Sequence, residues 1–288
     1  MEKKLLTIFG ASGLVGSSIL REALDKGYHV NGTLRDIERQ DRITRLKSLP
    51  SGNNAKFFQA DMAEISSLDH PLINSDAAII CCLIPTYKGF DGTPAKELDD
   101  ERGYNEIIKP TVDGCLNILK SAKINNVKNI LICSSTSSTN PITQVQIKNE
   151  LDHWSDEKEQ CNSKKYTSAA KTYMERAAFK FCNENNLRLS VFLPTGLYGP
   201  AILPEHLKHN PFLWIKSVLE GGAPRHQKVP NDSASLIHLQ DLAKLFLAAY
   251  ENPSASGRYF GVLESFHWND IYKAVSYTHL RSPRDLAR

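Results

Sequence analysis

The sequence predicts an α/β protein built on a doubly wound parallel sheet, and three observations lead to this prediction. Strand-like and helix-like segments alternate over residues 1–195. The strand-like segments are apolar and β-branched without clean alternation, as expected where helices cover both faces of a parallel sheet. A glycine-rich turn joins the first strand to the first helix. Together these features are typical of a Rossmann sheet that binds a dinucleotide.

Strand-like and long helix-like segments follow one another in a regular order up to Pro194. The expected strands are Lys4–Phe9, Tyr28–Leu34, Ala55–Asp61, Asp76–Leu83, Val127–Ser135 and Leu187–Pro194. The expected helices are Leu14–Gly27, Tyr104–Asn126 and Ser163–Asn186. Gly27 suits the C-cap of the first helix, and Pro110 is tolerated because it falls near the first turns of the second.

The texture of the chain changes after Pro194, where proline and glycine become frequent. We expect one helix at Phe212–Glu220, a short strand and a helix within Ser235–Pro253, and a last strand at Gly257–Val262. These segments predict a dinucleotide-binding domain at 1–195 and a smaller substrate lobe at 196–274, interleaved with the end of the sheet.

Residues 275–288 break the pattern that precedes them. The string VSYTHLRSPRDLAR carries three arginines against one aspartate and has no amphipathic period. It is similar to translated read-through of a sequencing adapter, so we expect the natural sequence to stop near Ala274. A longer clone that continues differently after Ala274 would confirm this expectation.

The composition excludes several classes of protein. A net charge of +3, scattered along 288 residues, argues against a nucleic-acid partner. No apolar run approaches the roughly 20 residues of a membrane span, and the charged start runs into a strand without room for a signal peptide. The six cysteines show no metal-ligand spacing, so we expect no metal, a cytoplasmic protein and reduced cysteines in its core.

The turn after the first strand reads GASGLVG and places Gly10, Gly13 and Gly16 in a Gly-x-x-Gly-x-x-Gly pattern. Glycines there let the backbone turn tightly and let a pyrophosphate approach the N-terminus of a helix, where free N–H groups favour an anion. The pattern follows a strand and opens a helix, which is the context that dinucleotide binding requires. The expected contacts are Gly10, Ser12, Gly13, Leu14, Val15 and Gly16.

The end of the second strand favours NADP(H) over NAD. Leu34 stands where an NAD site has an acid, and Arg35 follows it. An arginine can hold a 2′-phosphate with two hydrogen bonds, whereas a carboxylate would repel it. Asp36 is the competing signal. Asp61 and Met62, after the third strand, are expected to hold the adenine ring.

Several motifs together resemble the extended short-chain dehydrogenase/reductase superfamily. They are the glycine pattern, TLRD after the second strand, ICSSTSS after the fifth, KTYMERAAF, LPTGLYGP and SLIHLQDLA. Within the superfamily the chain is most similar to the branch of the dihydroflavonol reductases and cinnamoyl-CoA reductases, which belongs to the NAD-dependent epimerases and dehydratases. The resemblance covers about Leu5 to Tyr259.

The resemblance implies hydride transfer between the nicotinamide and a carbonyl or alcohol carbon, in a monomer or homodimer. It assigns Ser135 to polarising the carbonyl oxygen and Lys171 to holding the nicotinamide ribose and lowering the pKa of a tyrosine. Pro194 and Thr195 would flank the nicotinamide. A tyrosine that titrates at about 10 needs such a nearby ammonium to donate a proton at working pH.

The tyrosine is the part of the pattern that departs from the superfamily. Thr167 occupies the position four residues before Lys171, and Tyr166 lies five residues before it. A four-residue step turns about 40° net on an α-helix, but a five-residue step turns about 140°, away from the lysine. A π-bulge or an irregular first turn could bring Tyr166 back, and Tyr166 is the predicted proton donor on that basis. Otherwise Tyr166 is a packing residue and Thr167 faces the cofactor.

Three further side chains have expected places, and two other functions stay open. Tyr173 is expected in the core, His238 in a structural hydrogen bond, and Tyr87 near the substrate. A sugar-nucleotide epimerase or dehydratase of the same fold would prefer NAD, which Arg35 disfavours. A non-catalytic NADP-binding regulator finds support in the displaced tyrosine. The main prediction remains an NADP(H)-dependent reductase of a ketone or aldehyde.

Overall fold

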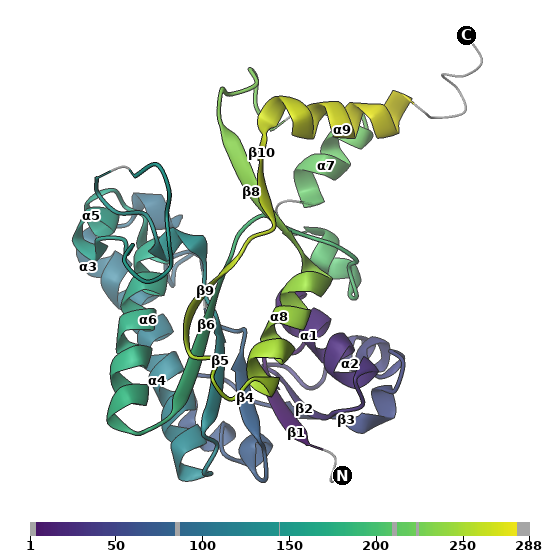
Figure 1. Cartoon of the computed structure of the whole chain (residues 1–288), viewed down its shortest axis with the longest axis vertical. Coiled ribbons are helices and arrows are strands. Elements are labelled where there is room, and N and C mark those ends of the chain that lie inside the picture. The colour runs from purple at the N-terminus through teal and green to yellow at the C-terminus, as the bar shows by residue number, and fades with distance from the viewer. Residues whose placement is uncertain (1–3, 84–86, 144, 209–211, 223–224, 281–288) are drawn as a thin grey trace.

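A seven-stranded parallel sheet forms the centre of the molecule (Figure 1). The computed structural model describes residues 4–83, 87–143, 145–208, 212–222 and 225–280. The strands follow the order β3-β2-β1-β4-β5-β6-β9. Their bounds are β1 (Leu5–Phe9), β2 (His29–Leu34), β3 (Ala55–Gln59), β4 (Ala77–Ile80), β5 (Asn129–Cys133), β6 (Arg188–Pro194) and β9 (Gly257–Gly261). The strand order reverses between β1 and β4, and ligands of such sheets bind at that point, beyond the carboxyl ends of the strands.

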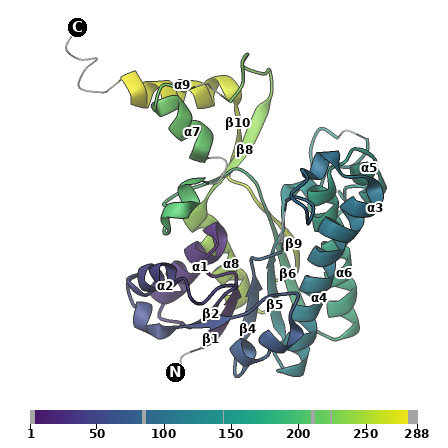
Figure 2. The same ribbon diagram turned by 180° about the vertical axis from the view of Figure 1, so that it is seen from behind.

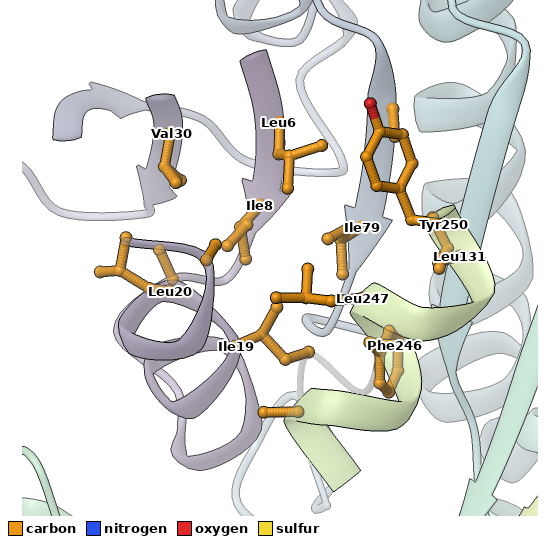
Figure 3. Packing of buried hydrophobic residues seen from close by; sticks show 14 of the residues in the cluster. Leu6, Ile8, Ile19, Leu20, Val30, Ile79, Leu131, Phe246, Leu247 and Tyr250 are labelled. Atoms are coloured by element: carbon orange, nitrogen blue, oxygen red, sulfur yellow. The ribbon is translucent and has the colours of Figure 1, made fainter. Parts of the chain in front are cut away.

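Helices α1 (Leu14–Asp25), α2 (Gln40–Lys47) and α8 (Leu239–Glu251) lie on one side of the sheet (Figures 1 and 2). Apolar residues of α1 recur at helical spacing, and Ile19 and Leu20 are fully buried. Figure 3 shows them with Phe246 and Leu247 of α8 over Ile8 of β1. Burying each such aliphatic side chain contributes about 1.5–3 kcal/mol, so this cluster holds α1 and α8 on the sheet.

Helices α4 (Lys109–Ile124) and α6 (Tyr166–Glu184) cover the opposite side, next to the shorter α3 (Asp100–Gly103) and α5 (Glu157–Asn162) (Figure 2). Ile118 and Leu119 of α4 and Met174 of α6 are fully buried in a second apolar cluster on this face. Both faces of the sheet are therefore covered, which explains why its strands lack polar alternation. The described chain also has short 3₁₀ helices at Gly52–Asn54, Ile65–Ser67, His70–Leu72, Ala95–Glu97, Thr136–Ser138 and Pro204–Lys208.

The helix expected at Tyr104–Asn126 is more complex than its sequence pattern. A π-helical turn, Tyr104–Ile108, connects α3 to α4. Pro110 follows in the first turn of α4. Proline has no backbone N–H, so in a regular α-helix it would leave one carbonyl oxygen without its hydrogen bond. The wider turn accommodates the proline and lets one helical rod run from Asp100 to Ile124.

The chain after Pro194 contributes to two sheets. Strands β7 (Leu197–Tyr198), β8 (Ser233–His238) and β10 (Glu264–His267) form a three-stranded sheet, while α8 and β9 belong to the main sheet. With α7 (Phe212–Leu219) and α9 (Trp268–Leu280), the small sheet projects beyond the carboxyl ends of the main strands (Figure 1). Trp214 of α7 meets Trp268 and Tyr272 of α9, with ring centroids 6.0 and 5.8 Å away.

Two expectations concern the C-terminal end of the chain and membrane-spanning helices. Helix α9 passes the expected end of the natural sequence, and residues 281–288 of the expected non-native tail lie outside the described residues. In the part of the chain that the structure describes, no helix is both long and apolar enough to span a membrane.

Candidate active site

The glycine turn between β1 and α1 is shaped for a close backbone approach. Gly10 has φ +82°, and a Cβ at Gly16 would stand only 2.2 Å from the Gly10 carbonyl oxygen, so neither position accommodates a side chain. No side chain caps the first turn of α1, which leaves its N–H groups available to an anion. This turn fits a dinucleotide pyrophosphate.

A cavity of about 1360 Å³ opens over this turn and runs into the small sheet. It brings together ten of the predicted site residues, which are Gly10, Ser12, Gly13, Arg35, Asp61, Met62, Ser135, Lys171, Pro194 and Thr195. Leu14, Val15 and Gly16 are not among its lining residues; they form the first turn of α1 behind the glycine turn. Tyr166 does not line the cavity either.

Arg35 lies at the end of the cavity that β2 forms. It is exposed, and no carboxylate of the described residues lies within ion-pair distance of it. The competing Asp36 is engaged elsewhere, because its Oδ1 accepts a hydrogen bond of 2.9 Å from the Glu38 backbone. Arg39 is also occupied, by two hydrogen bonds to Asp41. Arg35 is therefore the arginine that is available for a phosphate at this edge.

Ser135 and Lys171 face the cavity from β5 and α6. Ser135 caps the short 3₁₀ helix after β5, and its Oγ accepts a hydrogen bond of 3.2 Å from the Ser137 N–H. The Ser135 hydroxyl proton remains available to a ligand. Lys171 Nζ donates to the Cys133 carbonyl oxygen at 3.3 Å, which holds the ammonium near the end of β5.

The structure corrects the predicted position of Tyr166. This side chain is fully buried against Gly103, and its hydroxyl donates to Asp100 Oδ1 at 2.8 Å. Helix α6 is regular from its first residue, so neither a π-bulge nor an irregular turn rotates Tyr166 toward Lys171. Burial, followed by the hydrogen bond to Asp100, raises the pKa of Tyr166 to about 12. Tyr166 is thus a packing residue. It does not line the cavity, so it is not positioned to contact a cofactor there or to donate a proton.

Thr167 and Ser168 line the cavity beside Lys171 in place of that tyrosine. Thr167 and Lys171 share a face because four residues make little more than one helical turn. Tyr173 is half-buried and meets Tyr104 edge to face, at the third apolar cluster. The residue four positions before Lys171 on this helix face is therefore a threonine.

Two of the remaining predictions concern His238 and Tyr87. His238 Nδ1 accepts a hydrogen bond of 3.3 Å from the Gln240 N–H and caps α8, which confirms its structural role. Tyr87 lines the cavity, as expected for a residue near the substrate, although 67% of its surface is exposed.

The cysteines differ from the expected uniform core set. Cys115 and Cys182 are buried, whereas Cys81, Cys82 and Cys133 are only partly buried and line the cavity. Their position at the carboxyl ends of β4 and β5 was the available signal, because these strand ends meet at the ligand edge of the sheet. Among the described residues, no group of three or more metal-ligating side chains comes together.

A buried ion pair that the sequence did not reveal supports the cavity wall. Arg258 on β9 and Glu175 on α6 are joined by a 2.9 Å contact, with 3% and 0% of their side chains exposed. Arg258 Nη2 donates to Ser138 Oγ at 3.0 Å, and its guanidinium lies 3.6 Å from the ring centre of Trp154. Glu175 also accepts a hydrogen bond from Ser134, so the network joins the serine turn to the loop that follows it.

A family model matches residues 6–262 of the chain, and its description is NAD dependent epimerase/dehydratase family. This match covers the main sheet, the glycine turn and most of the small sheet.

Curated plant proteins are similar to the chain over most of its length. A dihydroflavonol 4-reductase of Callistephus chinensis is 32% identical over 259 residues, which are 88% of this chain and 66% of the relative. An anthocyanidin reductase of Vitis vinifera is 26% identical over 294 residues, 98% of this chain and 84% of the relative.

Solved structures share the fold. Gre2 of Candida albicans in complex with NADPH superimposes with a TM-score of 0.77 at 20% identity, covering 96% of this chain and 84% of that chain. Vestitone reductase from alfalfa (Medicago sativa) gives a TM-score of 0.73 at 21% identity, covering 97% and 86%.

Proposed function

We propose that this chain, which belongs to the NAD-dependent epimerase/dehydratase family and is an NAD(P)-dependent oxidoreductase, uses NADPH as its reductant. The proposed substrate is a ketone or aldehyde of a small or aromatic molecule. One observation carries the proposal. One cavity is lined by Arg35, the glycine turn, Ser135 and Lys171, and the strand order β2-β1-β4-β5 sets Arg35 and the glycine turn on one side of it and Ser135 on the other. That order of groups matches the order of phosphate, ribose and nicotinamide along a dinucleotide.

The proposal gives each cavity group a definite task. When bound, NADPH supplies the hydride that reduces the carbonyl carbon. The Ser135 hydroxyl donates a hydrogen bond to the carbonyl oxygen and stabilises the negative charge that develops there. The Lys171 ammonium holds the nicotinamide ribose, and Arg35 holds the 2′-phosphate that distinguishes NADPH from NADH.

Proton delivery to the new alkoxide runs through Thr167 and water in this proposal. Thr167 lines the cavity and occupies the position four residues before Lys171, where the superfamily pattern has its tyrosine. Thr167 and Lys171 lie on the same face of α6. A hydroxyl can pass a proton from water to the alkoxide without itself ending as an anion. The route is slower than donation by a tyrosine because an aliphatic hydroxyl is a far weaker acid.

The substrate class follows from the cavity and the relatives. Residues 196–274 are proposed as the substrate lobe, since Tyr198, Leu236 and Trp268 line the same cavity. Apolar and aromatic walls of this kind suit an aromatic carbonyl compound, and the named relatives are flavonoid-type reductases. A sugar-nucleotide epimerase is the weaker alternative, because it needs firmly held NAD and Arg35 favours NADPH.

Consumption of NADPH with a panel of aromatic and aliphatic ketones and aldehydes tests the proposal. We expect turnover that is faster with NADPH than with NADH. Lys171→Met should lower kcat/KM by about a hundredfold. A loss of this size is typical when one group that assists proton transfer or stabilises charge in the transition state is removed. The matched control is Lys165→Met, which removes an exposed lysine just before α6 and should leave turnover unchanged. Binding of NADPH without turnover on any carbonyl would contradict the proposal and favour a non-catalytic regulator.

The threonine route has a separate test in the same assay. Thr167→Tyr places a phenol four residues before Lys171, so kcat should rise about tenfold or more. Thr167→Phe adds the same ring without the hydroxyl and should lower kcat. Equal effects of the two substitutions would contradict a role for a proton donor at position 167.

A further inference from the structure

Two cysteines stand side by side at the ends of neighbouring parallel strands. Ile80 of β4 is in register with Ile132 of β5, so Cys81 and Cys133 are the next pair along the strands. The spacing of neighbouring strands, about 4.8 Å, agrees with the separation of Cα atoms in disulfides, about 4.4–6.8 Å. The backbone therefore holds the two residues at a distance that a disulfide can bridge.

The two thiols also lie on the same face of the sheet. Side chains alternate along a strand, so Cys81 follows Ile79 and Cys133 follows Leu131 onto one face. Figure 3 shows Ile79 and Leu131 on the side of α8, and both cysteines pack against that same cluster. Cys82 packs against the cluster on the opposite face.

Both cysteines line the cavity, and their thiols differ electrostatically. Each is partly buried and belongs to the cavity lining. Hydrogen bonding between the two thiols, followed by burial, raises the pKa of Cys81, and the same hydrogen bonding lowers the pKa of Cys133. The positive charge of Lys171, whose Nζ is 3.3 Å from the Cys133 carbonyl oxygen, acts in the same direction on Cys133. The ammonium held beside Cys133 favours the thiolate of that residue, so Cys133 attacks first and Cys81 reacts second.

We propose that Cys81 and Cys133 form a reactive dithiol in the floor of the cofactor cavity, which a hydroperoxide oxidises to a disulfide. The Cys133 sulfur attacks one peroxide oxygen, the O–O bond breaks, and the departing alkoxide takes the thiol proton to become an alcohol. The resulting sulfenic acid is attacked by the Cys81 sulfur. The S–S bond forms, the S–O bond breaks, and hydroxide leaves with the Cys81 proton as water. Two thiols lose two electrons, and the peroxide gains them.

A second part of the inference rests on the proposed function. A dinucleotide lying between the glycine turn and Lys171 would cover both thiols, since all these groups line one cavity. Bound NADP⁺ should therefore protect the dithiol.

Peptide mapping by mass spectrometry after treatment with hydrogen peroxide tests the dithiol directly. We expect a Cys81–Cys133 linked peptide in the full-length chain that a dithiol reductant removes. Cys81→Ser and Cys133→Ser should abolish this peptide. The matched control Cys82→Ser should retain it, because Cys82 is adjacent to Cys81 in the sequence but faces the other side of the sheet. A linkage that uses Cys82, or oxidation of Cys133 without any linkage to Cys81, would overturn the proposal.

A trivalent arsenical provides a second readout that does not depend on oxidation. Phenylarsine oxide binds pairs of close thiols, so unmodified protein should take up one equivalent that a dithiol, but not a monothiol, removes. The Cys81→Ala and Cys133→Ala variants should lose this site, while Cys82→Ser keeps it. Unchanged uptake by the two alanine variants would contradict the pairing of these thiols.

Oxidation in the presence of saturating NADP⁺ separates the two parts of the inference. We expect the linked peptide to form at least about tenfold more slowly, because fewer than one molecule in ten is then free of NADP⁺. Rapid linkage despite NADP⁺ binding in a titration would refute the protection alone. Failure of NADP⁺ to bind at all would instead refute the proposed function and leave the dithiol intact.

Discussion

Arg35 is the side chain on which the choice of cofactor depends. Its guanidinium has no carboxylate partner among the described residues, so it meets a phosphate without first breaking an ion pair. Arg35→Ala should raise the Kd of NADPH about tenfold, the scale of losing a charge-assisted hydrogen bond at an exposed site, and leave that of NADH unchanged. Titration of nucleotide fluorescence measures both constants.

Arg39→Ala is the control for that titration. Arg39 is already bound to Asp41 by hydrogen bonds of 2.9 and 2.8 Å, so its removal should not alter the preference for NADPH. A loss of NADPH preference in Arg39→Ala but not in Arg35→Ala would contradict the assignment of the 2′-phosphate to Arg35.

Tyr166 should matter for stability rather than for catalysis. Tyr166→Phe removes a hydroxyl that donates to Asp100 and to the Leu98 carbonyl oxygen, at 2.8 and 3.3 Å. We expect the free energy of unfolding to fall by about 1 kcal/mol and kcat/KM to stay unchanged. Denaturant unfolding and steady-state kinetics measure the two effects. A hundredfold loss of kcat with NADPH affinity intact would reinstate Tyr166 as the proton donor.

Residue positions that follow from local chain geometry were predictable, and those that depend on distant packing were not. The glycine turn, Arg35 and Ser135 line the cavity because a strand, a turn and the next element fix their positions locally. Helical periodicity alone already turned Tyr166 away from Lys171. The residues that Tyr166 contacts, Asp100 and Gly103, belong to another helix, and no local sequence pattern predicts that contact.

The loop after the serine turn depends on one buried ion pair. Glu175→Ala leaves the Arg258 guanidinium without its carboxylate in a site where only 3% of that side chain is exposed. Breaking such a pair from one side costs about 3–5 kcal/mol in the free energy of unfolding. The expected result is a large drop in stability, measured by denaturant unfolding.

A surface pair serves as the comparison for that measurement. Asp241→Ala breaks a 3.9 Å contact with Lys244 in which both side chains are more than half exposed, so it should cost no more than about 1 kcal/mol. Similar losses in the two variants would contradict the importance assigned to the buried pair. Replacing both partners, Glu175→Met with Arg258→Met, should recover part of the lost stability because no charge is then left buried and unpaired.

Most of the elements could be predicted because their patterns are strong. All six predicted strands of the first domain and its long helices are present within a few residues. The sequence patterns do not predict strands β7 and β10 or helices α2, α3, α5 and α9. β7 has only two residues, and β10 pairs with β8 across a stretch of chain that contains α8 and β9. Pairing over such a separation leaves no local periodicity to detect.

At the scale of the whole molecule, the cavity exists because two parts of the chain meet. The main sheet provides the glycine turn, Arg35, Ser135 and Lys171, and the small sheet provides Tyr198 and Leu236. The doubly wound sheet follows from alternating strands and helices. The shape of the wall that the small sheet adds depends on how residues beyond Pro194 pack together, which a single sequence does not specify.

Deuterium transfer from labelled NADPH shows whether this protein moves a hydride to a carbonyl carbon. NADPH carrying deuterium at both C4 positions of the nicotinamide is incubated with the protein and with the best carbonyl compound of the panel, and the product is analysed by mass spectrometry. The account predicts an alcohol with one deuterium on the former carbonyl carbon, formed faster than with labelled NADH. Tight binding of labelled NADPH with no deuterium in any product would contradict it.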